Sequence, residues 1–409
     1  MSLSAGAQTE TTQSNWEKSY ELKAVSLLAI GFGLVGLDRF IIAPLFPAIA
    51  EDLGLNYQDL GLISGVLALT WGIASLFAGK LTDRVGHRRV VVTSVILFSS
   101  LVAMSGLATG LTSLIVIRAL MGFAEGGFVP ASIVATMDAA KPTRIGLVVG
   151  IQQMASPLVG LGLGPIVAVT LLQFVSWEWV FAIIAVPGFV LAYFLQKTLR
   201  PPEEPAPASQ STEAPGFRSV LAFRNVVFGA LAMICFFSSL HPLSAFMPSY
   251  MTDHLGLSMQ NMGFVMSAMG MGGVIGMLLV PALSDRLGRK PVLLLAMAVA
   301  CAAMWLIILG KPATTVLALC LFTVSFTVSG AIAITIGPLM HASVPLHMTA
   351  TATGLVAGLG EIVGGAIVPA VAGGVADASG IESIFYITGS AAILGLAITA
   401  FGIKEPAKQ

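Results

Sequence analysis

The sequence predicts an all-α integral membrane protein, with twelve transmembrane helices arranged as two six-helix halves and both termini in the cytoplasm. The first observation behind this prediction is composition. Hydrophobic residues make up 56% of the chain and charged residues 10%, with a mean hydropathy of +0.93, whereas a soluble domain is about 25% charged. The other two observations are a regular series of apolar segments and a polar stretch near the middle of the chain.

The apolar segments are long enough to cross a bilayer, which takes about 20 residues in a helix. Six of them precede the polar stretch and six follow it. We expect spans at 24–47, 59–79, 90–109, 112–137, 145–173, 178–196, 223–250, 260–283, 291–309, 314–341, 350–374 and 382–403.

The polar stretch includes RPPEEPAPASQSTEAPG at 200–216. It is rich in Pro and Glu and cannot bury a core, so we interpret it as a linker. The predicted organisation is a cytoplasmic tail at 1–23, a first half at 24–196, a cytoplasmic linker at 197–222, a second half at 223–403 and a short cytoplasmic tail at 404–409.

The positions of Lys and Arg predict the orientation, because basic residues collect on the cytoplasmic side of a membrane protein. When the connecting segments are assigned alternately to the two sides, one side receives only Lys311. Every other basic residue outside the spans falls on the opposite side, while Arg39 and Arg118 lie within spans. Both termini and the linker are therefore predicted to be cytoplasmic, and one missed span would scramble this pattern.

Composition also limits the class of function. The formal net charge is zero and there is no strongly charged tail, so nucleic acid is not an expected partner. Cys235, Cys301 and Cys320 each lie inside an apolar segment, where we expect them to pack helices rather than form a disulfide or a metal site. No nucleophile–base pair or metal-ligand spacing is discernible. The sequence thus predicts no enzymatic activity, no metal and no cofactor.

A short motif is repeated in the two halves. GKLTDRVGHRR at 79–89 follows the second span, and PALSDRLGRK at 281–290 follows the eighth. Their aspartates, Asp83 and Asp285, lie about half a chain length apart. Two similar halves joined by a linker suit alternating access, in which the halves rock about a site near the midplane.

These motifs and the twelve-span plan resemble the major facilitator superfamily over essentially all of residues 24–403. Two further stretches resemble its anion:cation symporter branch, namely Asp38-Arg39 in span one and RALMGFAEGGFVP at 118–130 in span four. Span eleven, with GEIVGGAIVPAVAG at 360–373, resembles that branch too. The resemblance implies a carrier that moves sugar acids or other organic carboxylates together with protons.

The chain departs from these patterns at two positions. Pro281 stands in the second copy of the loop motif where the first copy has Gly79. Glu361 stands where the symporter branch usually has a polar uncharged residue, often Asn. The second half therefore matches the motif less closely, and Glu361 weakens any transfer of substrate by analogy.

Four charged residues lie at membrane depth on spans one and four. Asp38 and Arg39 are about 14 residues from the start of span one, or roughly 21 Å at 1.5 Å per residue. Glu125 is near the middle of span four, with Arg118 on the same helix face roughly 10 Å nearer the outer end. That separation is too long for a direct pair within the helix. We therefore expect the partners of Arg118 and Glu125 on span one.

Charges at this depth are costly, and they persist where they face a cavity, a partner or a substrate. The planar guanidinium of Arg39 suits a carboxylate ligand, and we assign Arg118 to the substrate as well. Asp38 and Glu125 can take up and release protons, and an anion beside an ionised Glu125 would be repelled. Proton and anion should therefore bind together. In the branch that the chain resembles, the acids of these spans are the proton sites and the span-one Arg contacts the substrate. The alternative is a structural charge network between spans one and four.

Further candidates have weaker signals. Glu361 is a third acid at membrane depth, and it is either a further proton-coupling or selectivity residue or a protonated side chain hydrogen-bonded between helices. His241 either contacts substrate or makes a local hydrogen bond. Gln152 either faces the cavity or bonds a neighbouring helix. The remaining candidate substrate contacts are Ser244 and Tyr250.

The repeated loop motif is the predicted gate. Asp83 lies just past the apolar part of span two, where it can meet the amino-terminal end of a neighbouring helix or an Arg. We assign gating to Asp83 and Arg84 and, by the repeat, to Asp285 and Arg286. In the superfamily this element stabilises the outward-facing form; the alternative is that these charges only set the topology.

Together these observations predict a monomeric secondary transporter in a bacterial inner membrane. It would move a small organic anion, a mono- or dicarboxylate of sugar-acid or aromatic-acid type, coupled to protons by alternating access. The expected partners are that anion, protons and the lipid bilayer. One alternative is a proton-coupled exporter of amphipathic or drug-like compounds. A second is a membrane sensor of the same fold that does not transport.

Overall fold

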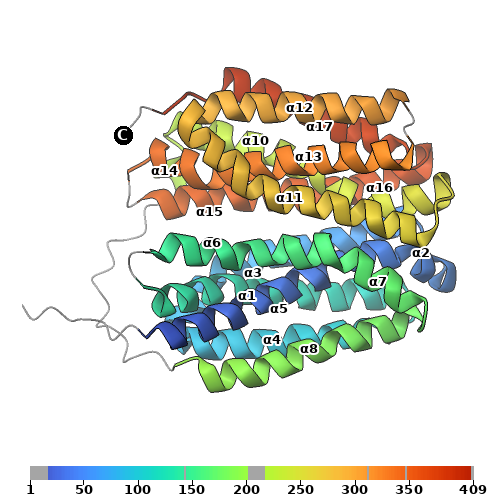
Figure 1. Cartoon of the computed structure of the whole chain (residues 1–409), viewed down its shortest axis with the longest axis horizontal. Coiled ribbons are helices and arrows are strands. Elements are labelled where there is room, and N and C mark those ends of the chain that lie inside the picture. The colour runs from blue at the N-terminus through green and yellow to red at the C-terminus, as the bar shows by residue number, and fades with distance from the viewer. Residues whose placement is uncertain (1–16, 142–143, 201–216, 311–312, 346–347, 407–409) are drawn as a thin grey trace, which may run out of the picture.

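The computed structural model describes residues 17–141, 144–200, 217–310, 313–345 and 348–406, and every long element in these ranges is a helix. The chain runs back and forth along one axis, so that the helices form a single bundle (Figure 1). The elements are α1 Lys18–Phe40, α2 Ile42–Leu53, α3 Tyr57–Val85, α4 His87–Ser105, α5 Leu111–Ala139, α6 Ile145–Pro157, η2 Leu158–Leu163, α7 Gly164–Leu172, α8 Trp177–Thr198, α9 Phe217–Val220, α10 Arg224–Ser249, η3 Tyr250–His254, α11 Met259–Leu287, α12 Arg289–Gly310, α13 Thr314–Ile334, η4 Thr335–Leu339, α14 Met340–Ser343, α15 Thr349–Leu359, η6 Gly360–Ile367, α16 Val368–Ser379 and α17 Ser383–Phe401.

Eleven helical segments of the described chain are long and apolar enough to cross a membrane, and each coincides with an expected span. The one expected span without such a match is the second in the chain, 59–79. It lies within α3, which is not among the eleven. α3 has 29 residues, or roughly 43 Å at 1.5 Å per residue. The count of twelve spans therefore stays a prediction. Most of the helices are longer than the expected apolar spans, because polar residues at their ends are helical too.

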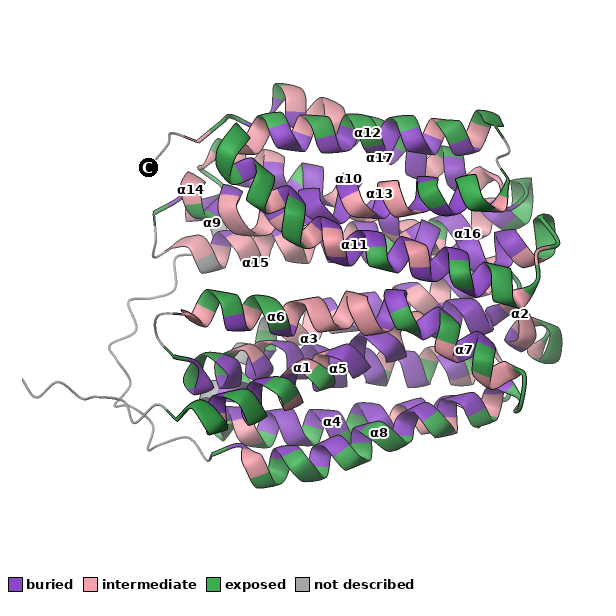
Figure 2. Ribbon diagram, viewed as in Figure 1, coloured by how far each residue is buried: buried purple, intermediate pink, exposed green. Residues whose placement is uncertain are grey.

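Two hydrophobic clusters organise the bundle. One is built from residues between Ala24 and Leu199, and the other mainly from residues between Val220 and Ile403. Around them, exposed residues run along α8 and α12 at the edges of the bundle (Figure 2). Many of these are large and apolar, such as Phe189 of α8 and Leu306 of α12, and such surfaces suit a hydrocarbon solvent. Lys311 and residues 201–216, on which the predicted orientation and linker partly depend, lie outside the described residues.

The two ends of the bundle differ. We call the end at which α1 begins and α17 finishes the terminal end, and the opposite end the distal end (Figure 1). At the distal end the halves are in close contact. A Cβ added at Gly65 of α3 would lie 2.7 Å from the main-chain oxygen of Ala366 in η6, and one at Gly263 of α11 would lie 3.2 Å from Val169 of α7. The distal end is therefore closed.

At the terminal end the same comparison gives the opposite result. A Cβ added at Gly146 or Gly150 of α6, or at Gly354 or Gly358 of α15, would meet nothing within 4 Å. Figure 1 shows α6 and α15 on facing sides of the two halves at this end. The halves are thus parted at the terminal end and joined at the distal end.

Prolines interrupt the helices near the centre of the bundle. α1 ends at Phe40, four residues before Pro44, because a proline ring clashes with the carbonyl four residues earlier and cannot donate a hydrogen bond. The same effect occurs at two wide helical turns. η2 contains Leu161, four residues before Pro165, and η6 contains Gly365, four residues before Pro369. Asp38 and Arg39 consequently lie in the last turn of α1, and Glu361 lies on η6. Such irregular turns are frequent at functional sites.

Candidate functional site

A hydrogen bond from a charged side chain of α5 to the backbone of α1 links these two helices. Nη1 of Arg118 donates a hydrogen bond to the main-chain oxygen of Asp38 at 2.7 Å. Arg118 is only 1% exposed, and its guanidinium lies 5.9 Å from the ring centroid of Phe181. The expected link between spans one and four is therefore present, but Arg118 uses the backbone of Asp38 and not its carboxylate. The Nε and Nη2 atoms of Arg118 are buried without a hydrogen-bond partner among the described residues.

Glu125 is completely buried on α5. Within the described part of the chain, neither of its carboxylate oxygens has a hydrogen-bond partner. The glycines on either side of this position allow α5 to approach α3 closely, since a Cβ at Gly126 would lie 2.5 Å from the main-chain oxygen of Trp71. Arg39 and Arg118 are near enough for their charges to act on Glu125. A buried carboxylate without hydrogen bonds is unfavourable when ionised, so this position suits a group that binds a proton.

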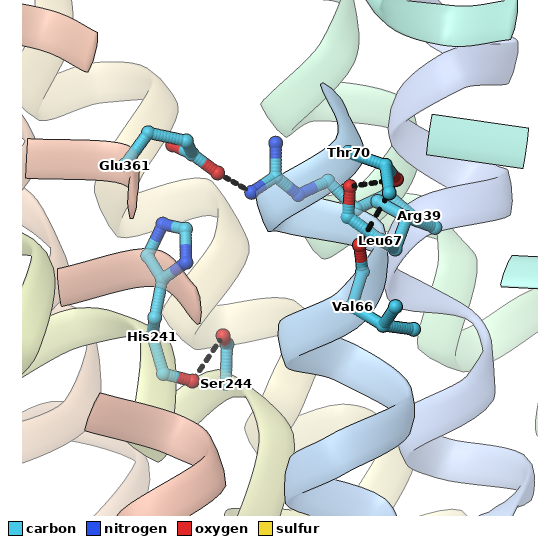
Figure 3. Close-up of polar contacts among 7 residues, drawn as sticks. All are labelled: Arg39, Val66, Leu67, Thr70, His241, Ser244 and Glu361. Carbon is cyan, nitrogen blue, oxygen red and sulfur yellow. Dashed lines mark hydrogen bonds and ion pairs between the residues drawn. The ribbon is translucent and has the colours of Figure 1, made fainter. Parts of the chain in front are cut away.

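Arg39 joins the two halves. Its Nη2 donates to Oε1 of Glu361, forming an ion pair between α1 and η6 (Figure 3). The Arg39 side chain is 15% exposed and that of Glu361 is 7% exposed, so Arg39 is more accessible than Arg118. The rings of Phe40 and Trp71 each lie 5.7 Å from its guanidinium carbon. The sequence predicts the partners of Arg118 and Glu125 on span one, but it does not predict Glu361 as the partner of Arg39.

A small cavity adjoins this ion pair. Its volume is about 30 Å³. Arg39 and Arg118 line it from the first half, and His241, Ser244 and Gly365 line it from the second. The Ser244 hydroxyl donates to the main-chain oxygen of His241 at 2.8 Å, and His241 lies beside Glu361 (Figure 3). The cavity is far smaller than the several hundred Å³ that enclose a small ligand.

Two other candidate substrate contacts lie away from this cavity. Gln152 is buried, and its Nε2 donates to Oγ of Ser132 at 2.8 Å, which is the helix-to-helix bond of the alternative interpretation. Tyr250 lies toward the distal end, with its ring 4.8 Å from that of Phe385 and stacked on His254 at 5.2 Å. Neither residue lines the cavity that contains Arg39.

The loop motif lies at the parted terminal end. The Asp83 side chain is outside the described residues, and Arg84 is exposed. In the second copy, Asp285 pairs with Arg289 at 2.5 Å within the same half, and Arg286 is exposed. The gating role of these residues remains a prediction, because the ends that they would join are apart in this conformation.

The contacts that close the distal end had no counterpart in our sequence analysis. The Asp377 carboxylate of α16 accepts hydrogen bonds from the backbone N–H groups of Tyr57 at 3.0 Å and Gln58 at 2.8 Å, in the first turn of α3. The Tyr57 hydroxyl also bonds the Asp253 carboxylate at 3.1 Å. The only sequence signal was an acid at the end of span eleven, and such acids are common.

Two helical halves joined by a charged pair near the middle of the bundle suit a membrane-transport fold. The sequence profile of the Major Facilitator Superfamily matches residues 28–364. The chain belongs to this superfamily, as our sequence analysis predicted. Its relatives are transporters, so the class of protein is a transporter and not an enzyme.

The relatives include organic-acid carriers. The hexuronate transporter of Bacillus subtilis (strain 168) is 29% identical over 262 residues, which cover 62% of this chain and 62% of that protein. The sialic acid transporter NanX of Escherichia coli (strain K12) is 25% identical over 398 residues, covering 94% of this chain and 95% of its own length. Among solved structures, a mutant form of the nucleoside transporter NupG is 15% identical with a TM-score of 0.78, covering 93% of this chain and 99% of that chain. That last likeness concerns the fold alone.

Proposed function

We propose that this protein transports small organic acids together with protons across a bacterial inner membrane. The observation that carries the proposal is a partly accessible Arg39 between the two halves, near enough for its charge to act on the buried Glu125. A guanidinium held between aromatic rings at the junction of two moving halves is suited to bind a carboxylate. The names of the hexuronate and sialic acid carriers support an acid as the substrate.

The roles divide between the charged residues. Arg39 binds the substrate carboxylate, and Arg118 supplies further positive charge at the same cavity, where it also ties α5 to the Asp38 backbone. Glu125 binds the coupled proton, and Asp38, which is 3% exposed, shares that role. A proton on Glu125 removes the negative charge that would repel the entering anion. Proton and anion therefore bind together.

The proposed orientation places the terminal end in the cytoplasm, as the basic residues predict. In this orientation the conformation described above opens inward and is closed outward. Asp83, Arg84, Asp285 and Arg286 then lie on the cytoplasmic side, where they would hold the terminal end together in the outward-open form. Alternating access moves the Arg39 site between the two ends.

The test compares Glu125→Gln with Glu51→Gln, a change at an exposed acid at the end of α2. Each purified full-length protein is placed in liposomes with galacturonate, sialic acid or an aromatic acid as the probe. Glu125→Gln should abolish uptake driven by a proton gradient and leave exchange of labelled for unlabelled substrate measurable, while Glu51→Gln behaves as wild type. If Glu125→Gln takes up substrate with the gradient at the wild-type rate, Glu125 is not the coupling residue.

The same liposomes separate the other functions. An exporter of amphipathic compounds would be stabilised against heat by lipophilic cations and not by acids, although the two arginines of the cavity disfavour cations. A sensor without transport activity would bind an acid and show no flux. Binding of acids without flux, or no binding of acids at all, would overturn the proposed function.

A further inference from the structure

Glu361 and Arg39 form an ion pair that links η6 in the second half to α1 in the first. Both residues lie near the centre of the bundle, at the level where the closed distal end meets the parted terminal end. Glu361 is 5% exposed. Its neighbours in the second half are His241 on α10 and Gly365, one turn later on η6, where a Cβ would lie 3.0 Å from a Glu361 carboxylate oxygen. The carboxylate is thus held in a fixed position facing Arg39.

The pair occupies the place that a ligand carboxylate would take. The Arg39 guanidinium is flanked by Phe40 and Trp71 and directs Nη2 at the Glu361 carboxylate. Beside it the cavity has a volume of about 30 Å³, far below the several hundred Å³ that enclose a small ligand. In this arrangement the Glu361 carboxylate therefore holds the Nη2 atom of Arg39 that an organic acid would bind.

A buried guanidinium needs a counter-ion in every closed intermediate of the transport cycle. Removing one partner of a buried ion pair leaves an uncompensated charge, which is strongly unfavourable. With substrate bound, the substrate carboxylate supplies the negative charge. Without substrate, Arg39 is in contact with the negative charge of Glu361, its ion-pair partner in the described part of the chain.

We infer that Glu361 is a built-in substitute for the substrate carboxylate, which holds Arg39 when the carrier is empty and lets the empty carrier change its orientation. This inference rests on the proposed function. It gives Glu361 two measurable effects. The Glu361 carboxylate competes with the substrate for Arg39, and its presence permits the return step that net uptake requires and that exchange does not.

The competition sets the size of the expected change in affinity. The apparent dissociation constant rises in inverse proportion to the fraction of molecules whose site is free. If Glu361 holds Arg39 in about nine molecules of ten, removing its charge tightens binding about tenfold. Glu361→Gln should therefore bind substrate more tightly and yet fail to accumulate it.

The experiment uses the full-length chain in liposomes at one fixed pH, with whichever of galacturonate, sialic acid and an aromatic acid binds the wild type. Binding is followed by fluorescence of Trp71, which lies beside Arg39, in a background with the other tryptophans replaced by Phe. Glu361→Gln is expected to bind about tenfold more tightly, to lose net uptake and to keep exchange. Glu361→Asp, which retains a carboxylate, should keep part of the net uptake, and Glu51→Gln should match wild type.

Several outcomes would overturn the inference. One is unchanged or weaker binding by Glu361→Gln, and another is net uptake by that variant at the wild-type rate. Glu361→Asn serves as a second neutral variant if Glu361→Gln does not fold, as judged by its thermal unfolding, and the same results are expected of it. If the wild type binds none of the three acids, the proposed function itself fails. If the wild type binds and transports while the Glu361 variants behave like it, only this inference fails.

Discussion

The Asp377 carboxylate accepts a hydrogen bond from the backbone N–H of Tyr57 at 3.0 Å, across the boundary between the two halves. The same carboxylate accepts from Gln58 at 2.8 Å. The first N–H groups of a helix have no partner within the helix, and they carry partial positive charge. An acid of one half therefore caps a helix of the other half, and this cap exists only while the distal end is closed.

Asp377→Ala should loosen the distal end. Loss of an amino-terminal cap costs about 1 kcal/mol, so the closed form should lose about fivefold in population relative to the open form. Electron-resonance distances between spin labels at Glu51→Cys and Ser379→Cys, with the three native cysteines replaced by Ala, would show a longer component. Glu17→Ala removes an exposed acid that pairs with Arg200 and should leave the distances unchanged. An unchanged distance distribution in Asp377→Ala would refute the capping role.

Gln152→Leu should reduce stability more than it reduces substrate binding. Gln152 is buried and its amide donates to the Ser132 hydroxyl on α5, so its loss removes a buried helix-to-helix hydrogen bond worth about 1 kcal/mol. Thermal unfolding should shift downward, with substrate affinity changed less than twofold. Ser132→Ala, which breaks the same bond from the other side, should act alike. A large loss of affinity in Gln152→Leu alone would instead assign Gln152 to the substrate.

Arg118→Lys should destabilise the first half and disturb substrate binding indirectly. Its guanidinium bonds the main-chain oxygen of Asp38 and lies near the ring of Phe181. Hydrogen bonds to charged groups contribute about 1.5–3 kcal/mol, and the ammonium of Lys cannot reproduce the planar geometry. Denaturation of the detergent-solubilised protein measures this loss. Arg39→Lys, at the more accessible arginine, should instead weaken binding with little change in stability. The reverse ranking of the two variants would exchange their roles.

The helices could be predicted from the sequence because membrane crossing leaves a local signal. An apolar length of about 20 residues and basic loops are readable without any tertiary contact. A partner for Arg118 on span one was also predicted, because Arg118 and Glu125 are too far apart to pair within their own helix. The Arg39–Glu361 pair could not be predicted this way, since its members lie on spans one and eleven and meet only through packing of the two halves.

The irregular turns and the distal contacts were missed for related reasons. Hydropathy does not register the extra residue of a wide turn such as η6, although Pro369 gave a local hint. The cap of α3 by Asp377 exists only when the distal end of the bundle is closed. The sequence of a single segment does not predict which conformation the protein adopts. Glu361 was recognised as unusual at its position, but its partner required the second half to be placed against the first.

Gly270→Val should push the carrier out of the conformation described above. Gly270 lies on α11 directly against the backbone of Leu161 and Gly162 in η2, so any added Cβ would overlap the main chain of the other half. Neither backbone can rotate away as a side chain can. Overpacking costs about 1–3 kcal/mol, and here the cost falls only on the form with a closed distal end. The same spin labels should therefore report a distal end that is open in most molecules, and net uptake should fall.

Gly354→Val on α15, where an added Cβ meets nothing within 4 Å, is the matched control and should leave both measurements unchanged. Normal uptake with an unchanged distance in Gly270→Val would mean that α11 and η2 do not form the distal contact during transport.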